Sequence, residues 1–231
     1  MSAPPPIFNL SQVSKHFAAY SALQSISCTF DAGDHLMLLG SNGAGKSTLL
    51  RILAGITNQT SGSISRGLSS SAAVGYAGHR SMLYAQLTVH ENLELACSLY
   101  RRAVSAIDEI MSRWGIHQYR HHLPKQLSQG LQARVSLARA CMIDPEVLLL
   151  DEPSAALDQH SVEILLNEIK RLADRHSGNN LVVIATHDIE RLAPFSNRIL
   201  VIENGSIIRD TRSRDSADID EAIRAYRRLN R

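Results

Sequence analysis

The residues with the clearest chemical role lie together in one segment, Gly40-Ser41-Asn42-Gly43-Ala44-Gly45-Lys46-Ser47-Thr48. Its spacing matches G-x-x-x-x-G-K-[ST], a pattern of loops that hold phosphate groups. The glycines let the backbone turn its N–H groups inward around an anion, and a helix that starts in the segment adds its positive dipole end. We expect Lys46 to reach the terminal phosphates and the Ser47 hydroxyl to ligate Mg²⁺. The segment therefore predicts a site for a nucleoside triphosphate.

The residues on either side supply the strand and the helix that such a loop needs. His35–Leu39 is a short apolar run typical of a strand buried in a parallel sheet. After the loop, apolar residues recur at helical spacing until Gly55, which is suited to the end of a helix. A glycine-rich turn with an incidental lysine is the alternative, but it leaves the order of strand, loop and helix unexplained.

Two further apolar runs end in residues that can act on a phosphate chain, at Asp151-Glu152-Pro153 and at Thr186-His187-Asp188. Ligand sites gather at the carboxyl ends of parallel strands, so we expect both runs to end beside the phosphates. Asp151 suits a partner of Mg²⁺, Glu152 could orient or deprotonate an attacking water, and His187 could contact the terminal phosphate. Taken singly, the acidic pair could be a charged helix entry and His187 a structural histidine. Together with the loop upstream, the catalytic interpretation is favoured.

Two strands and an aromatic loop are predicted ahead of the phosphate-binding segment. Ile7–Val13 alternates apolar and polar residues, and Ile26–Phe30 is a second candidate strand. Between them we expect a loop that exposes Phe17 and Tyr20. An aromatic ring beside a phosphate site can stack on a nucleotide base, although a ring that covers a sheet edge is the simpler account of either residue alone.

Residues 80–126 change character and predict a helical lobe, because apolar residues recur at three- to four-residue spacing in Glu91–Arg102 and Val104–Trp114. Three histidines between residues 117 and 122 could suggest a metal site, but no acidic or cysteine ligand is close in sequence, so a solvated surface is favoured. Further along, Asn204-Gly205 predicts a two-residue hairpin. Asp218–Leu229 predicts a terminal amphipathic helix, either packed on the body or docking a partner.

Composition excludes several classes of protein. Lys and Arg number 24 against 22 Asp and Glu, a formal net charge of +2, which gives no strong attraction to nucleic acid or to an anionic membrane. No apolar run approaches the ~20 residues that span a bilayer. Cys28, Cys97 and Cys141 lie far apart in the sequence, which is typical of ordinary thiols in a reducing compartment.

The order of these motifs resembles the ATP-binding subunits of ABC transporters over about residues 7–210. The matching motifs are the phosphate loop, Leu127-Ser128-Gln129-Gly130, Leu150-Asp151-Glu152-Pro153, Ser154-Ala155-Ala156-Leu157-Asp158 and Thr186-His187-Asp188. The resemblance implies an α/β fold: a P-loop NTPase core with a mixed sheet flanked by helices, an N-terminal antiparallel β part and an inserted α-helical lobe. It implies a single ABC ATPase domain, with the core in residues 7–78 and 144–210, the helical lobe in 79–143 and a helical tail in 211–231.

The resemblance also assigns roles, with ATP and Mg²⁺ as cofactors. Ser128-Gln129-Gly130 would bind the γ-phosphate of ATP held by an opposite subunit, which fits the anion affinity of a capped helix N-terminus. This implies a head-to-tail dimer around two ATPs, formed with a second copy or with another ATPase subunit. Asp158 would end the loop that links the two sites. Phe17 falls where the family places its adenine-stacking aromatic ring, and Tyr20 is the alternative.

One position departs from the family pattern. Where the family usually has a glutamine that touches Mg²⁺ and couples to the membrane subunit, this chain has His79 within Gly78-His79-Arg80. A histidine ligates Mg²⁺ poorly compared with an oxygen donor, so coupling or metal geometry is expected to differ here. The Gly-His pair, with the sequence that follows up to Leu93, is similar to haem-exporter ATPases of the cytochrome c maturation type.

The function implied is a transport ATPase: ATP binding closes the dimer, hydrolysis opens it, and a separate integral membrane permease moves a cargo that the sequence does not name. We expect a peripheral subunit at the cytoplasmic face of a membrane, without a nucleic-acid partner. A soluble ABC ATPase that acts on ribosomes or DNA is the alternative, but this chain lacks the second ATPase unit, coiled coil or zinc motif usual in such proteins. A non-hydrolysing regulatory binder is disfavoured, because Lys46, Asp151, Glu152 and His187 are all present.

Overall fold

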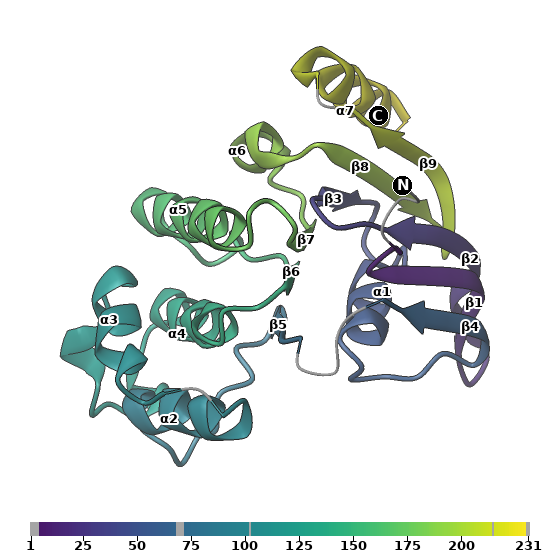
Figure 1. Ribbon diagram of the computed structural model, residues 1–231. Helices are drawn as coiled ribbons and strands as arrows, with labels where there is room; N and C mark the ends of the chain where they lie inside the picture. Colours follow the sequence, from purple (N-terminus) through teal and green to yellow (C-terminus); the bar gives the residue numbers. More distant parts are fainter. Residues whose placement is uncertain (1–4, 68–71, 102, 214, 230–231) are drawn as a thin grey trace. The chain divides into compact units, whose positions relative to one another are not determined.

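Two segments far apart in the sequence build one compact unit, and the segment between them builds another (Figure 1). The first unit combines Met1–Ser71 with Leu181–Arg231, and the second is Ala72–Asn180. The computed structural model describes residues 5–67, 72–101, 103–213 and 215–229. The predicted core and lobe boundaries divide the chain at other residues, and that division stays a prediction.

The first unit contains an antiparallel sheet and a mostly parallel one. In the antiparallel sheet β1 lies between β2 and β4, while β3 of the other sheet lies between β7 and β8, parallel to both, with β9 antiparallel to β8. The elements of this unit are β1 (Phe8–Phe17), β2 (Tyr20–Phe30), β3 (His35–Leu39), α1 (Lys46–Leu53), β4 (Ser61–Arg66), β7 (Leu181–Ala185), α6 (Ile189–Leu192), η3 (Ala193–Phe195), β8 (Arg198–Glu203), β9 (Ser206–Arg212) and α7 (Ser216–Leu229). The predicted α/β class, with a mixed sheet and an N-terminal antiparallel part, is confirmed.

The predicted loop around Phe17 and Tyr20 is wrong. β1 continues to Phe17 and β2 begins at Tyr20, so the two aromatic residues face each other across a tight hairpin. The turn residues are Ala18 and Ala19, and Ala18 takes a φ of 49°, a left-handed conformation that alanine rarely adopts. The sequence carried no Asn-Gly signal at this turn, which is why the hairpin was missed.

The Asn204-Gly205 hairpin is confirmed, since β8 and β9 pair antiparallel around it. Its turn also fastens neighbouring segments together. The Gly205 N–H donates to the carbonyl of Ala44 at 3.0 Å, and the Gly205 carbonyl accepts from the N–H of Gln24 at 2.8 Å. The turn is therefore tied both to the phosphate-binding segment and to β2.

The C-terminal helix α7 packs on the body of the first unit, which settles the alternatives left open by its amphipathic pattern. Its buried residues Ile219, Ala222 and Ile223 join a hydrophobic cluster with residues of β3 and β8. The cluster includes Met37 and Leu39 of β3, so α7 covers one side of the strand that leads to the phosphate loop.

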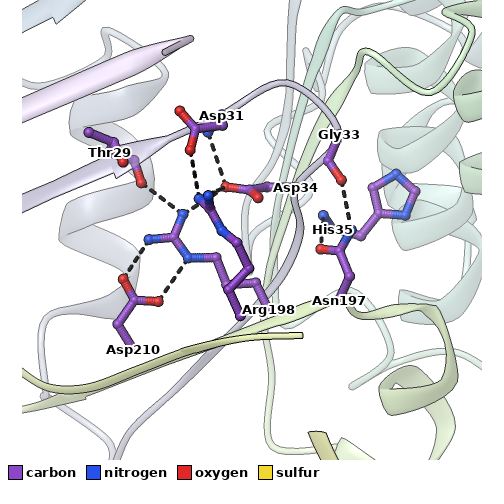
Figure 2. Close-up of polar contacts among 9 residues, drawn as sticks. Thr29, Asp31, Gly33, Asp34, His35, Asn197, Arg198 and Asp210 are labelled. Carbon is purple, nitrogen blue, oxygen red and sulfur yellow. Dashed lines mark hydrogen bonds and ion pairs between the residues drawn. The ribbon is translucent and has the colours of Figure 1, made fainter. Parts of the chain in front are cut away.

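A buried arginine ties both sheets of this unit to the turn before β3 (Figure 2). Arg198 donates to Asp34 at 2.7 Å, to Asp210 of β9 at 2.8 Å and to the Thr29 carbonyl of β2 at 2.8 Å. Burial alone lowers the pKa of Arg198, but hydrogen bonding to Asp210 and the charges of Asp210 and Asp34 raise it above its ordinary value. These contacts fix the turn where β3 starts. Arg212 adds a 2.9 Å bond to Asp34, and we call these residues the Arg198 cluster.

The second unit is mainly helical, with β5 and β6 paired in parallel. Its helix α4 packs against α2, α3, α5 and β5. The elements are β5 (Val74–Ala77), α2 (Val89–Leu99), α3 (Ala106–Arg113), η1 (His117–Tyr119), η2 (Pro124–Gln126), α4 (Gln129–Met142), β6 (Val147–Asp151) and α5 (Gln159–Arg175). The lobe helices exist as predicted with shifted ends, and Arg102 of the predicted range lies outside the described residues.

A capping box explains why the first lobe helix starts early. The Glu91 carboxylate accepts from the Thr88 N–H at 2.7 Å, while the Thr88 hydroxyl accepts from the Glu91 N–H at 3.2 Å. This reciprocal pair satisfies two N–H groups at the helix end and lowers the pKa of Glu91. The helix therefore begins at Val89, before the apolar periodicity that predicted it.

The three cysteines are free thiols. Burial raises the pKa of Cys28 to about 12, and it also raises the pKa of Cys97 and Cys141 above the ordinary value. A thiol with a raised pKa holds little thiolate at neutral pH, so none of them has the character of a nucleophile or a metal ligand. This agrees with their interpretation as ordinary thiols.

Removing the charge of Asp34 tests the Arg198 cluster. Asp34→Asn keeps the shape of the side chain but leaves Arg198, which is 3% exposed, with one carboxylate fewer. We expect a loss of about 3 kcal/mol in the free energy of unfolding, measured by urea denaturation. The control Asp31→Asn removes only an exposed contact to Arg212 and should cost less than about 1 kcal/mol. Equal losses for the two variants would contradict the role given to Arg198.

Candidate functional site

The phosphate loop is held against β2, so glycine is required at its end. Gly45 precedes α1 with a φ of 112°, and a Cβ atom there would lie 2.5 Å from the Ala22 carbonyl oxygen of β2. Only a residue without a side chain permits both the backbone conformation and this close approach. The predicted strand, loop and helix are thus present in the order β3, Gly40–Gly45, α1.

The side chain of Lys46 is folded back over the start of the loop. It is 6% exposed, and its Nζ donates to the carbonyls of Gly40 at 2.6 Å and Ser41 at 3.1 Å. These two bonds fix the ammonium at the loop while largely removing it from water. A cation in this setting attracts an anion more strongly than one in bulk solvent, because the local dielectric is lower.

His187 lies beside this lysine, as predicted for a residue that follows β7. Its Nε2 is 3.0 Å from Asn42 Oδ1 and 3.4 Å from Lys46 Nζ. An ammonium has no acceptor, so Nε2 can donate only to Asn42 when it carries the proton and can accept from Lys46 only when it does not. The first unit therefore brings together Asn42, Lys46 and His187. His187 is exposed and can reach a ligand from solvent.

The aromatic hairpin meets the same loop. Phe17 and Tyr20 are 48% and 55% exposed. The ammonium of Lys15 stands 4.9 Å from the centre of the Phe17 ring, whereas the Tyr20 hydroxyl donates to the Gly43 carbonyl at 2.6 Å. Only Phe17 keeps an exposed ring that is not tied to the loop. The Tyr20 bond was missed from the sequence, since nothing in the spacing of the two residues reports it.

In the second unit, three of the predicted site residues line one cavity of about 540 Å³. These are His79 after β5, Gln129 at the start of α4, and Glu152 after β6. Glu152 has a φ of 53°, a left-handed conformation that costs about 1–2 kcal/mol for a residue other than glycine. Such strain persists where the surroundings impose it, and it is concentrated at functional sites. Asp151, by contrast, is 2% exposed at the end of β6.

The N-terminus of α4 is built for close contact. The Ser128 hydroxyl accepts from the Leu131 N–H at 3.3 Å, which confirms the predicted cap. A Cβ atom on Gly130 would lie 2.9 Å from the carbonyl oxygen of Ala156, so the absence of a side chain lets the two segments approach. Asp158 caps α5 by accepting from the Ser161 N–H at 2.8 Å, and it pairs with Arg134 at 3.1 Å. The predicted linking loop is thus anchored to α4 at two points.

The comparisons with known proteins agree with this geometry. The model of the family described as ABC transporter matches residues 23–155. The probable sulfate/thiosulfate import ATP-binding protein CysA of Chlorella vulgaris is 31% identical over 220 residues, covering 90% of this chain and 92% of that protein. The chain belongs to the ABC transporter family.

Other relatives are longer than this ABC cassette. The macrolide export ATP-binding/permease protein MacB of Hyphomonas neptunium is 32% identical over an alignment of 234 positions, which covers 92% of this chain but 36% of that protein. The sulfate/thiosulfate import ATP-binding protein CysA of Vibrio cholerae is 33% identical over 213 residues, 86% of this chain and 56% of that protein. The chain thus spans only about a third to a little over half of these relatives.

Solved structures share the fold. A dimeric, post-hydrolysis structure of the ATP-binding cassette MJ0796 with ADP and Pi bound has a TM-score of 0.80 to this chain, at 27% identity, covering 90% of this chain and 99% of that one. An ATP-binding subunit of another ABC transporter has a TM-score of 0.81 at 21% identity, which supports the fold alone.

The loop of the first unit fits the phosphates of a nucleotide. Gly45 leaves room that a Cβ would fill, and Lys46 supplies a positive charge held by two carbonyls. The donors predicted for the metal, Ser47 and Asp151, both offer oxygen, the atom that Mg²⁺ prefers. The lobe histidines offer no comparable set, because the described ranges contain no group of three His, Cys, Asp or Glu side chains suited to a metal. His117 instead lies 3.8 Å from Asp108.

Adding one methyl group at Gly45 tests whether the close approach of the loop to β2 is required for ATP binding. Gly45→Ala combines a left-handed φ with the 2.5 Å clash on Ala22, so we expect ATP affinity to fall at least about tenfold, measured with a fluorescent ATP analogue. Gly178→Ala is the matched control, since its φ is 72° but nothing lies within 4 Å of the added atom. It should lower stability by about 1 kcal/mol and leave ATP affinity unchanged. Unaltered ATP binding by Gly45→Ala would rule out the close approach as a requirement.

Proposed function

We propose that this chain binds and hydrolyses ATP to drive transport through a separate membrane permease. The observation that carries the proposal is the placement of Lys46, with its ammonium held by the Gly40 and Ser41 carbonyls and beside His187. A nearly buried cation within a glycine-rich loop at a helix N-terminus is suited to the phosphates of a nucleotide.

The residues divide the work of hydrolysis as follows. The loop from Gly40 to Thr48 binds the phosphates through its N–H groups and Lys46. Ser47 and Asp151 are the proposed ligands of Mg²⁺, which supplies positive charge to the terminal phosphates when bound. Glu152 orients a water and takes its proton as the water oxygen bonds to the γ-phosphorus. The bond from that phosphorus to the bridging oxygen breaks, giving ADP and inorganic phosphate.

His187 is proposed to donate from Nε2 to an oxygen of the γ-phosphate. The contact with Asn42 Oδ1 supports this for the tautomer that carries its proton on Nε2, because that proton then lies at the loop. A donor directed at an oxygen that gains charge in the transition state lowers the barrier. His187 would thereby hold the phosphate in line with the attacking water.

We propose further that two ATPase subunits, identical or different, close around two ATPs. Each ATP would lie between the phosphate loop of one subunit and Ser128-Gln129-Gly130 of the other. The end of α4 supports this role, because Ser128 and Gln129 are exposed at the N-terminus of the helix, where the positive end of the helix dipole attracts an anion. The dimeric state of the cassette MJ0796 is consistent with it.

The proposed permease contact lies on the second unit. Met82, Tyr84, Leu99 and Tyr100 are large apolar side chains exposed there, and we call them the lobe patch. Arg139 lies close to three of these residues. It donates to the Met82 carbonyl, and although burial lowers the pKa of Arg139, charge interactions with Tyr84 and Tyr100 act in the opposite direction. Within the described residues no helix is long and apolar enough to cross a bilayer. A membrane-embedded partner would thus hold this subunit at the cytoplasmic face of the membrane.

The cargo is a narrower proposal. The pattern around Gly78-His79-Arg80 resembles haem-exporter ATPases of the cytochrome c maturation type, and this resemblance supports haem export. The names of the matched relatives refer to macrolides, sulfate or thiosulfate, and Fe³⁺ ions instead. Because cargo selection resides in the membrane partner, identifying that protein by affinity purification tests the assignment.

Replacing the proposed base tests the hydrolytic step. Glu152→Gln keeps the size of the side chain but cannot take a proton, so we expect ATP turnover to fall by about 10²–10⁴-fold with ATP affinity retained. The ATP-bound variant should also accumulate as a dimer in size-exclusion chromatography. Glu163→Gln, an exposed position on α5, should behave like the wild type. Full activity of Glu152→Gln would remove this residue as the base.

Polar substitution of the lobe patch tests the partner. Tyr84→Ser with Tyr100→Ser should abolish recovery of a membrane protein with the tagged chain, while ATP affinity stays at the wild-type value. Ile208→Ser, at an exposed apolar residue of β9 in the first unit, is the control and should keep the membrane partner. Recovery of ribosomes in place of a membrane protein would overturn the transport proposal in favour of a soluble ABC ATPase.

A further inference from the structure

Tyr20 is the side chain that links the β1–β2 hairpin to the phosphate loop. Its hydroxyl donates to the Gly43 carbonyl at 2.6 Å, although the ring is more than half exposed. The resemblance to the family offers Tyr20 only as an alternative to Phe17 for stacking on adenine. A ring whose hydroxyl is fixed on the loop backbone is suited to a different task.

We propose that Tyr20 is a positioning residue for the phosphate loop, acting on the triphosphate and not on the base. This inference rests on the proposed ATP-binding function. Phe17 keeps the base-stacking role, and the two aromatic residues of one hairpin thereby serve opposite ends of the nucleotide.

The peptide that Tyr20 holds explains the effect. In a trans peptide the carbonyl and the following N–H point in opposite directions, so a bond to the Gly43 carbonyl also orients the N–H of Ala44. That N–H donates to the Ser41 carbonyl at 3.1 Å, which closes a turn inside the loop. Ser41 in turn accepts from Lys46 Nζ. Tyr20 therefore stabilises the peptide from which the turn and the lysine contact follow.

The hairpin provides a fixed base for this bond. Lys15 Nζ donates to the Asn58 carbonyl at 2.8 Å, and the His16 N–H donates to the Thr60 hydroxyl at 3.1 Å. Both acceptors belong to the segment that follows α1, the helix at the other end of the loop. The hairpin is thus hydrogen-bonded to the segment after the helix, and these bonds hold the end of the strand from which Tyr20 reaches the loop.

Strand β2 contacts the loop at two successive points. Tyr20 bonds to Gly43, and the Ala22 carbonyl lies where a side chain on Gly45 would have to be. The start of β2 therefore reaches the loop at Gly43 through a side chain and at Gly45 through its backbone. Of these two contacts, the one between Tyr20 and Gly43 is a hydrogen bond, and loss of the Tyr20 hydroxyl removes it.

Binding of ATP and of inorganic tripolyphosphate, measured by calorimetry, separates the two aromatic roles. Tyr20→Phe should weaken both ligands by the same factor, about three- to tenfold for one hydrogen bond. Phe17→Leu should weaken ATP and leave tripolyphosphate unchanged. Tyr119→Phe, at a tyrosine of η1 in the second unit, is the control and should bind both ligands like the wild type. If Tyr20→Phe weakens ATP alone, or neither ligand, the proposal is wrong.

Amide hydrogen exchange in the protein without nucleotide provides a second readout. The N–H of Ala44 should exchange faster in Tyr20→Phe than in the wild type, because the turn it closes is less stable. Phe17→Leu should show wild-type exchange at this amide, and equal exchange in the wild type and in Tyr20→Phe would count against the proposal. Lys46→Ala tests the proposed ATP-binding function separately from the role of Tyr20. If that variant keeps wild-type affinity for both ligands, ATP binding by this loop is refuted.

Discussion

The first unit depends on keeping one lysine ammonium at the phosphate loop and nearly out of water. Lys46 achieves this through two backbone carbonyls of its own loop, which share the positive charge but carry none of their own. Everything around the loop serves this arrangement, since β3 delivers Gly40 and Ser41, α1 starts at Lys46, and β2 limits the space behind Gly45.

Strand β3 transmits the constraint through the unit. Its carboxyl end leads into the loop, and its other end follows the turn that the Arg198 cluster fixes. Between the two ends, α7 covers Met37 and Leu39. A strand held at both ends and along one side leaves the loop little freedom to shift. The contacts that stabilise the unit therefore also fix the geometry of the loop.

The sequence predicted best what depends on local chemistry. The strand–loop–helix order around Lys46, the Ser128 cap and the Asn204-Gly205 hairpin each follow from residue types a few positions apart. It failed where the deciding contact was distant, as at Ala18-Ala19, whose turn is imposed by the pairing of β1 with β2 against its own conformational preference. The bonds of Tyr20 to Gly43 and of Arg134 to Asp158 could not be foreseen either, because each joins residues more than twenty positions apart.

The turn at Asn204-Gly205 is an example of a hairpin turn that also holds other segments of the chain in place. It has the composition of a site that tolerates insertions, and an engineer seeking a place for an epitope tag or a fluorophore would choose it. Yet Gly205 bonds to Ala44 inside the phosphate loop and to Gln24 of β2. A peptide inserted here would pull on the loop that binds the phosphates. Labels for following this cassette are better placed on the exposed face of α5.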